Sequence, residues 1–491
     1  MSGYELKDIK RNRDAPLSIV EGISLPNVVV VGAETSLSDE RPVDRYNLVF
    51  IILLIHGVGT LMPWNMFINA QDYFRNYKLA QSNETISSVE TEHLDDLRRN
   101  FLSYLSLASQ VPNVLFNGLN LIINMGSGNL KMRVNLTLLV EALIFALTIT
   151  LAVVDSTQWP VTFFYLTMIS VVVLNMASGI YQNCIFGTGA KFPGSYTNAI
   201  LIGSNFSGTF TSTVNLLSIW LAPKPQEAAM YYFITALLVI LVCIVSYNLL
   251  PMNRFYKFFD HDIMIPRPDD QFKPEQLEDE IKQSDEIPAI LRQTVDAMVP
   301  RPNEPEDRSF IGELRSKWRV FLKCWPQCLN VFLTFYVTLA LFPSVLADVT
   351  QVQDYFSKKY FTSFACFFVF NVFAMIGNLI SSWTTWPGRG RVWMLVVARF
   401  LFVPFFLFCN FNPKTRHWPV LIPDDIAFII GNVVLATSSG YLSSLCMMFA
   451  SNNLPASEAP KAGMLAAFSL VLGIFLGINS SLLLTRIVEL G

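Results

Sequence analysis

A series of long apolar segments constrains this sequence more than any other feature. The hydrocarbon core of a bilayer is about 30 Å thick, and a helix needs roughly 20 apolar residues to cross it. Eleven segments reach that length, at residues 47–69, 101–124, 134–154, 160–189, 197–221, 228–250, 327–348, 360–384, 391–410, 425–449 and 463–489. Only 15% of the 491 residues are charged, whereas soluble domains carry about 25%. The sequence therefore predicts an all-α polytopic membrane protein with eleven transmembrane helices.

Two polar segments divide the chain into predicted regions. Residues 1–43 form a polar cytosolic tail without the apolar core of a signal peptide, so we expect the first span to serve as both anchor and insertion signal. Residues 251–326 are rich in Pro, Glu, Asp and Lys and have few apolar residues for a core. We interpret them as a flexible cytosolic loop, with a basic amphipathic helix near 311–323 at the inner surface. This loop separates a six-helix N-terminal half, 44–250, from a five-helix C-terminal half, 327–491.

Two features predict the orientation in the membrane. Lys and Arg residues slightly favour the side of the N-terminus and the long loop, and cytosolic loops usually carry that excess. The triplet Asn83-Glu84-Thr85 is an N-glycosylation acceptor between the first two spans, which the same orientation places outside. We therefore expect a cytosolic N-terminus, glycosylation at Asn83 and, with an odd number of spans, a C-terminus outside. The tail has no convincing acidic dileucine signal, which favours the plasma membrane over the lysosomal membrane.

Ionisable residues within the predicted spans are few: His56, Glu141 and Arg399. Such residues are costly in a bilayer and are candidates for function. We interpret Arg399 as paired with carbonyl groups or a carboxylate, with substrate contact as the alternative. His56 fits a hydrogen-bonded packing residue better than a proton relay. Glu141 is a candidate coupling site, although the sequence shows no evident partner for it.

Uncharged amides are more abundant, mainly in the first, second and fourth spans. They are Asn65, Asn69, Gln110, Asn113, Asn117, Asn120, Asn175, Gln182, Asn183, Asn205 and Asn371. A single amide usually serves interhelical hydrogen bonding, whereas a concentrated set beside Trp64 and many Phe residues suits a polar, neutral ligand with an aromatic ring. The glycine pairs Gly203/Gly208 and Gly473/Gly477 predict close helix contacts and say nothing about the ligand.

Several function classes have no support in the sequence. It has no HExxH motif, Walker loop or pair of intramembrane aspartates, so neither an enzyme nor an ATP-driven pump is predicted. A net charge of −3 without a long basic run gives no support for nucleic-acid binding. Cys324 and Cys328 lie four residues apart, where a metal pair or a disulfide is the alternative to the reduced thiols that we favour. No metal or cofactor is predicted. The expected partners are a small-molecule substrate and the lipid bilayer, and the sequence predicts no particular oligomeric state.

A set of ordered motifs runs along most of the chain. It comprises Pro63-Trp64-Asn65 in the first span, Gln182 and Phe186-Gly187 in the fourth, Ser195-Tyr196-Thr197 entering the fifth, Phe342-Pro343 in the seventh, Phe370-Asn371 in the eighth, Trp386-Pro387-Gly388 after it, Ala398-Arg399, Val403-Pro404 and Asn410 in the ninth, and Gly440-Tyr441-Leu442 in the tenth. The set resembles that of the equilibrative nucleoside transporters, solute carrier family 29, in which Pro-Trp-Asn is a hallmark of the first helix. The resemblance covers about residues 44–489.

This resemblance implies a fold and a mechanism. The fold is related to the major facilitator architecture, and its six-helix and five-helix halves rock to expose a mid-membrane substrate alternately. Transport is facilitated diffusion, which the substrate gradient drives. The substrate-binding candidates that it carries over are Leu61, Trp64, Asn65, Ile68, Gln110, Asn113, Gln182, Phe342, Pro343, Asn371 and Ile474. Gln182 would hydrogen-bond the base, and the aromatic and aliphatic side chains would pack against its faces.

Two positions depart from the family pattern. The eighth span of the family usually carries an Asp and, four residues on, an Arg that reach the sugar of the substrate. Alignment on the flanking motifs places Ala374 and Asn378 there. Both charges are absent together, which avoids an unpaired buried charge. We therefore expect facilitative nucleoside transport with weakened or altered ribose contact. The alternatives are a carrier for a nucleobase or another small neutral or cationic solute, and a low-activity member that acts as a receptor or scaffold.

Overall fold

Each of the eleven apolar segments overlaps a helix, or a run of consecutive helices, in the computed structural model. The structure describes residues 42–70, 73–79, 93–95, 97–98, 101–122, 130–221, 225–260, 310–354, 357–413, 416–452, 454–455 and 457–490. The predicted glycosylation acceptor Asn83, the tail 1–41 and residues 261–309 of the predicted loop lie outside the described residues. Contacts group residues 44–491 into one unit.

Long helices build the N-terminal half. They are α1 (Leu48–Asn69), α3 (Phe101–Ile122), α4 (Leu130–Val153), α5 (Pro160–Gly189), α6 (Gly194–Leu221) and α7 (Pro225–Leu249), and the short α8 (Arg254–Phe259) follows α7. α1 packs along α6 and α7, whereas α5 packs against α3 and α4. The side chain of Asn253 caps α8 by accepting a hydrogen bond from the backbone of Phe255.

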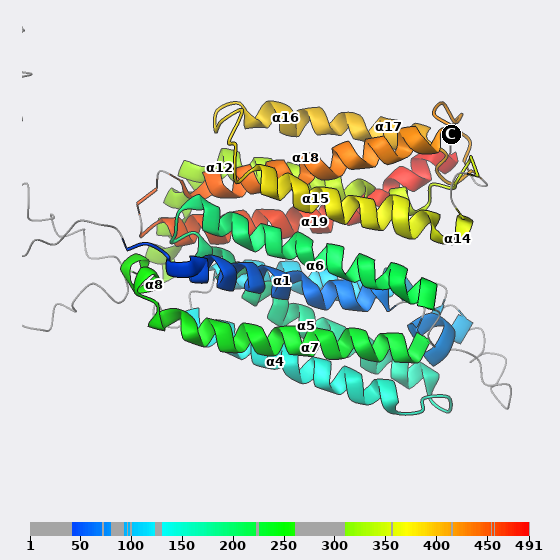
Figure 1. Cartoon of the computed structure of the whole chain (residues 1–491), viewed down its shortest axis with the longest axis horizontal. Coiled ribbons are helices and arrows are strands. Elements are labelled where there is room, and N and C mark those ends of the chain that lie inside the picture. Colours follow the sequence, from blue (N-terminus) through cyan, green and yellow to red (C-terminus); the bar gives the residue numbers. More distant parts are fainter. Residues whose placement is uncertain are drawn as a thin grey trace, which may run out of the picture. The chain divides into compact units, whose positions relative to one another are not determined.

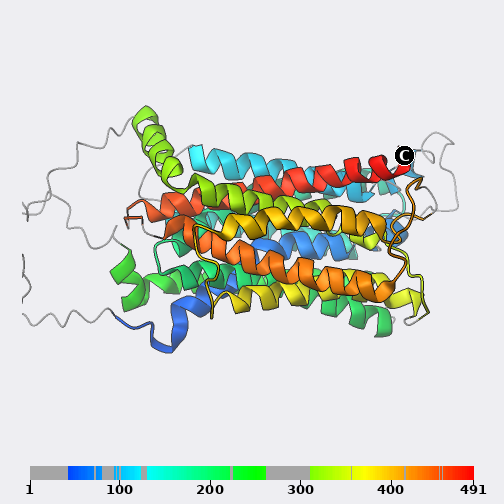
Figure 2. The same cartoon turned by 90° about the horizontal axis from the view of Figure 1, so that it is seen from above.

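In its described residues, the C-terminal half contains three long continuous helices, α12 (Phe310–Leu341), α18 (Asp425–Ser451) and α19 (Ala459–Leu490), and two composite ones. Its other elements are α13 (Ser344–Ala347), α14 (Lys358–Phe361), η4 (Thr362–Phe368), α15 (Val369–Ile380), α16 (Val392–Ala398), η5 (Arg399–Leu401) and α17 (Phe402–Phe408). α12 packs along α19, and α15 packs along α18. Figures 1 and 2 show that the helices of both halves run roughly parallel.

Length and composition identify a multi-pass membrane protein. Within the described residues, eight helical stretches are long and apolar enough to cross a membrane, and Val392–Phe408 is a shorter apolar stretch. α3 and α6 are also long, but they carry amides and hydroxyls along much of their length. The total of eleven crossings stays a prediction.

The first helix of the C-terminal half begins earlier than the sequence suggested. α12 starts at Phe310 and runs to Leu341, so the helix predicted near 311–323 and the span predicted from residue 327 belong to one helix. The predicted amphipathic helix near 311–323 is therefore the first part of α12. Charged residues such as Arg315 and Lys317 interrupt the apolar run in the sequence, although the helix continues through them with Arg315 exposed and Lys317 buried against α3.

Glycines bring helices into contact where the sequence predicted close packing. A Cβ atom on Gly203 would lie 2.0 Å from the Leu54 carbonyl oxygen of α1. A Cβ atom on Gly473 would lie 2.5 Å from the Phe332 oxygen of α12, and one on Gly477 would lie 2.6 Å from an oxygen of the same helix. These distances leave no room for a side chain, which confirms the predicted helix contacts.

Candidate functional site

Three candidate amides lie along the contact between α3 and α5. Gln110 and Asn113 occupy successive turns of α3, and Gln182 lies on α5. The helices come close because a Cβ atom on Gly179 would lie only 2.5 Å from the Asn113 carbonyl oxygen. Within the described part of the chain, none of the three side-chain amides hydrogen-bonds to another residue. Their donors and acceptors are thus available to a ligand.

A neighbouring set of amides bonds within the protein instead. Asn120 Nδ2 donates to Asn183 Oδ1 at 2.7 Å, and Asn183 Nδ2 donates to Asn117 Oδ1 at 3.0 Å. Asn183 Nδ2 also reaches the Met464 carbonyl oxygen on α19 at 2.9 Å, and Arg133 donates to Asn120 Oδ1 at 2.9 Å. These three asparagines therefore serve interhelical bonding, the ordinary role of a buried amide.

Two other candidates, Asn65 of the N-terminal half and Asn371 of the C-terminal half, both bond to α6. On α1, Asn65 Nδ2 donates to Ser207 Oγ of α6 at 3.1 Å. The next residue, Gly208, leaves space for Asn371 of α15, whose Oδ1 would lie 2.2 Å from a Cβ atom on the glycine. Asn371 Nδ2 donates to Ser212 Oγ of α6 at 2.9 Å. Asn65 and Asn371 thus flank one face of α6.

The aromatic candidate Phe342 packs in the C-terminal half. Its ring stacks on that of Phe370, with centroids 3.8 Å apart and an interplanar angle of 8°. The other apolar candidates are half-buried: Leu61, Trp64, Ile68, Pro343 and Ile474. Among the described residues, no hydrogen bond or ring contact joins Phe342 to the three available amides. The structure therefore assembles two candidate groups, one at α3 and α5 and one at α1, α6, α15 and the end of α12.

The two positions that depart from the family pattern have structural roles. Asn378 is fully buried. Its Nδ2 donates to the Leu201 carbonyl oxygen of α6 at 2.9 Å, and its Oδ1 accepts from Ser444 Oγ of α18 at 3.0 Å. The Ala374 carbonyl oxygen lies 1.9 Å from the position of a Cβ atom on Gly440, so α15 and α18 touch at this point. The neutral pair therefore holds α15 between α6 and α18.

Arg399 is buried at the junction of three helical segments. It donates to the Thr334 carbonyl oxygen at 2.8 Å, to Thr338 Oγ1 at 2.8 Å and to the Leu435 carbonyl oxygen at 3.4 Å. These bonds tie η5 to α12 and α18. The interpretation that Arg399 pairs with carbonyl groups is confirmed.

His56 and Glu141 are both buried in the N-terminal half. His56 Nδ1 lies 2.7 Å from Tyr181 Oη, and Nε2 lies 3.4 Å from Ser246 Oγ, so the interpretation as a hydrogen-bonded packing residue is confirmed. Ser178 lies close to Glu141, yet neither carboxylate oxygen has a partner in hydrogen-bond geometry among the described residues. A coupling role for Glu141 stays a prediction.

Free thiols occupy the positions where a metal pair or disulfide was the alternative. Cys324 Sγ and Cys328 Sγ are 3.8 Å apart, and both cysteines are free and buried. The described part of the chain contains no cluster of three or more His, Cys, Asp or Glu side chains that could hold a metal ion.

The sequence analysis missed the hydroxyl groups of α6 that accept hydrogen bonds from the side-chain amides of the candidate site. Ser204 and Ser207 lie one turn apart, and Thr211 and Ser212 follow on the next turn. Ser207 and Ser212 accept the bonds from Asn65 and Asn371. Ser204 Oγ lies 3.1 Å from Thr60 Oγ1 of α1. The offsets of three, seven and eight residues from Ser204 to the other hydroxyl residues of α6 mark one helix face. That spacing was the available signal for a polar face within an apolar helix.

Comparisons with known proteins agree with this geometry. A family model described as nucleoside transporter matches residues 168–486. Equilibrative nucleoside transporter 2 of Homo sapiens is 34% identical over 457 residues, which cover 90% of this chain and 98% of the relative. Equilibrative nucleoside transporter 1 of Rattus norvegicus is 33% identical over 472 residues, with coverages of 92% and 100%. A solved proton:xylose symporter of the major facilitator superfamily matches with a TM-score of 0.53 at 10% identity and covers 88% of each chain, which confirms the predicted fold. The chain therefore belongs to the nucleoside transporter family.

Proposed function

We propose that this chain carries nucleosides across the membrane by facilitated diffusion. Its family and two relatives named equilibrative nucleoside transporters support this substrate class. The observation that carries the proposal is the group of amides Gln110, Asn113 and Gln182, whose side chains have no protein partner among the described residues. A nucleobase presents donors and acceptors at the edge of a flat ring, and an amide offers both.

The contacts between the halves suit alternating access. Asn183 of α5 donates to the Met464 carbonyl oxygen of α19, and Asn371 of α15 donates to Ser212 of α6. Both bonds are between neutral groups, and such a bond contributes only about 0.5–1.5 kcal/mol net. Rocking of one half against the other can therefore exchange these bonds at small cost. The substrate gradient alone then drives net flux.

A second candidate substrate is a nucleobase or another small neutral or cationic solute. The observation that favours it is the position of Asn378, whose amide is engaged by α6 and α18. With Ala374 beside it, neither position offers a charge to ribose hydroxyls. We therefore expect weaker discrimination between a nucleoside and its free base than an Asp–Arg pair would give.

The proposed location is the plasma membrane, with the N-terminus in the cytosol and the C-terminus outside, and the lysosomal membrane is the alternative. Figure 1 supports the placement of the two ends on opposite sides, since α1 begins at the end of the bundle that carries α8, and the C-terminus lies at the opposite end. Glycosidase treatment of the chain from cells should lower its apparent mass, and Asn83→Gln should remove that shift. A wild-type chain that is insensitive to the glycosidase would contradict the external placement of this loop.

The transport test uses proteoliposomes that contain the purified full chain. We expect saturable uptake of radiolabelled adenosine and uridine without ATP or an ion gradient. Gln182→Leu should lower uptake roughly tenfold, since a hydrogen bond to substrate is worth about 1–1.5 kcal/mol. The matched control is Asn248→Leu, whose exposed amide on α7 bonds to Asn135.

Competition by unlabelled compounds against labelled nucleoside uptake then distinguishes the two candidate substrate classes. Stronger inhibition by unlabelled adenine or uracil than by the nucleosides would favour the second candidate. Absence of saturable flux of any of these compounds, with folded protein in the vesicles, would contradict both and favour the receptor or scaffold alternative.

A further inference from the structure

An apolar groove lies between α3, α12 and α19. Its volume is about 890 Å³, within the range of roughly 300–1,000 Å³ that accommodates drug-sized ligands. Trp318, Trp325 and Phe468 line it, together with Leu121 and Leu472. Trp318 is 59% exposed and Trp325 is 47% exposed. The groove therefore opens away from the bundle, toward the surrounding lipid.

Basic side chains gather at one edge of this groove. Arg315 and Lys317 of α12 line it. Arg133 of α4 and Lys461 of α19 lie close enough to Lys317 for their charges to interact with it. Among the described residues, Glu313 is the one carboxylate that interacts with Lys317. Positive charge is thus in excess beside a strongly apolar surface.

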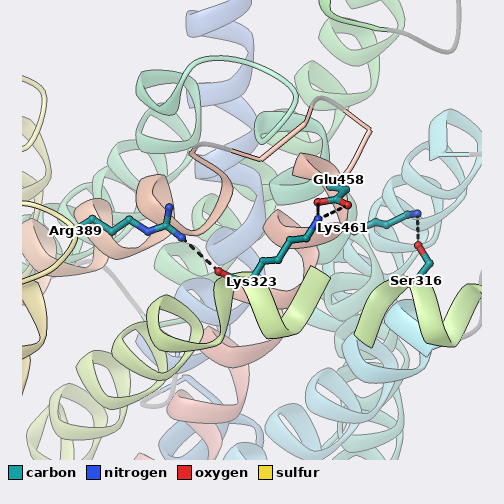
Figure 3. Close-up of polar contacts among 5 residues, drawn as sticks. All are labelled: Ser316, Lys323, Arg389, Glu458 and Lys461. Atoms are coloured by element: carbon teal, nitrogen blue, oxygen red, sulfur yellow. Dashed lines mark hydrogen bonds and ion pairs between the residues drawn. The ribbon is translucent and has the colours of Figure 1, made fainter. Parts of the chain in front are cut away.

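The close-up in Figure 3 shows how this edge is arranged. Lys461 extends from α19 to α12, where its Nζ donates to Ser316 Oγ at 2.9 Å. The carboxylate of Glu458 lies nearby, but it is paired with Lys323 at 2.7 Å. Lys317 is only 8% exposed and donates to a backbone oxygen of α3 at 3.4 Å. Lys317 and Lys461 are therefore held in place by the protein at the edge of the groove.

We propose that the groove binds an anionic phospholipid, with its phosphate beside Arg315, Lys317 and Lys461 and its acyl chains along Trp318 and Trp325. Lys461 and Arg133 lie close enough to Lys317 for their like charges to repel it, and a bound anion relieves that repulsion. The edge lies at the end of the bundle that we assign to the cytosol. Anionic lipids are concentrated in the cytosolic leaflet, and basic pockets between transmembrane helices bind their head groups. The site requires only the membrane setting and does not depend on the transported substrate.

The test is native mass spectrometry of the purified full chain titrated with phosphatidylserine or phosphatidylcholine. The wild type should bind phosphatidylserine more tightly. Arg315→Gln combined with Lys461→Gln should weaken that binding roughly thirtyfold, since each basic residue near an anionic lipid strengthens association about fivefold. Binding of phosphatidylcholine should fall much less, because its choline group cancels the charge of its phosphate. The matched control is Arg319→Gln with Lys131→Gln, which removes the same charge from two exposed residues that do not line the groove.

A second variant tests the apolar part. Trp318→Ala should weaken both lipids, whereas Trp393→Ala, an exposed tryptophan on α16, should weaken neither. Equal affinity of the wild type for the two lipids would overturn the proposal, as would a control double variant that loses as much affinity as the test variant. Competition by inorganic phosphate as effective as that by phosphatidylserine would identify a simple anion site and would also overturn the lipid assignment.

Discussion

The halves of this transporter meet at two seams that are built differently. At the first, between α6 and α15, amides make the contact. Asn198 Nδ2 donates to the Asn378 carbonyl oxygen at 3.1 Å and to Ser382 Oγ at 2.9 Å. Asn378 Nδ2 donates back to the Leu201 carbonyl oxygen at 2.9 Å. The directions and the number of these hydrogen bonds therefore determine how α6 and α15 fit together.

The second seam, between α5 and α19, depends on close approach. A Cβ atom on Gly463 would lie 2.5 Å from Ala190 Cβ and 2.6 Å from the Phe186 carbonyl oxygen. The hydrogen bond from Asn183 to the Met464 carbonyl oxygen accompanies this contact. Apart from the close approach of Gly208 to Asn371, the first seam depends on hydrogen bonds, so it can lose one bond and keep its shape, whereas the second cannot accept additional volume.

The largest expected effect comes from adding volume at the second seam. Gly463→Val places a branched side chain against a backbone oxygen that cannot move independently, and overpacking of this kind costs about 3 kcal/mol or more. We expect loss of the monodisperse fraction in size-exclusion chromatography and loss of uptake. Gly390→Val is the control, because nothing lies within 4 Å of a Cβ atom there. Normal folding of the Gly463 variant would show that the seam is looser than its distances indicate.

Removing the amide at the first seam should have a smaller effect. Asn378→Leu leaves the Leu201 oxygen and the Ser444 hydroxyl without their partner, and an unsatisfied buried polar group costs about 1–3 kcal/mol. The variant should fold with a clearly lower melting temperature in detergent. Asn378→Asp keeps the acceptor for Ser444 but removes the donor, so its melting temperature should also fall. A wild-type melting temperature for the leucine variant would contradict the structural role of this amide.

The helices of both seams could be predicted from the sequence because bilayer thickness fixes the length of an apolar segment. The start of α12 could not be predicted in the same way. Arg315 and Lys317 end the apolar run in the sequence, yet the helix continues through them from Phe310. A hydropathy window reports the apolar character of a segment and not its helical continuity, so it omits the charged first turns of this helix.

The candidate site shows a second limit of sequence reasoning. Gln182 and Asn183 are neighbours on α5, yet Asn183 bonds to α3 and α19, whereas Gln182 has no side-chain partner among the described residues. Gln182 and Asn183 carry the same side-chain amide, so their different bonding arises from the helices that each one faces. Sequence could predict a polar collection, but only tertiary packing separates the structural amides from those available to a ligand.

Restoring the family charges at the first seam should change selectivity, although it also removes the Asn378 amide that bonds to α6 and α18. The double variant Ala374→Asp/Asn378→Arg offers a charged pair to the ribose hydroxyls, and hydrogen bonds to charged groups contribute about 1.5–3 kcal/mol. We expect the preference for uridine over uracil to rise roughly tenfold in competition uptake. Asn378→Arg alone is the control and should be less stable, because it buries an unpaired charge. An unchanged ratio in a folded double variant would count against the altered ribose contact.

The smallest expected effect is at the single bond between Asn371 and Ser212, which crosses the first seam near the candidate site. A double-mutant cycle of Asn371→Ala and Ser212→Ala, read by melting temperature, should give a coupling energy of about 0.6 kcal/mol, the average for hydrogen bonds within membranes. Asn371 also donates to the Phe367 carbonyl oxygen of its own helical run at 3.0 Å, so its amide stays satisfied when the seam opens. A coupling of several kcal/mol would mean that this bond locks the halves together. A small value means that this bond of the polar seam can be exchanged during transport.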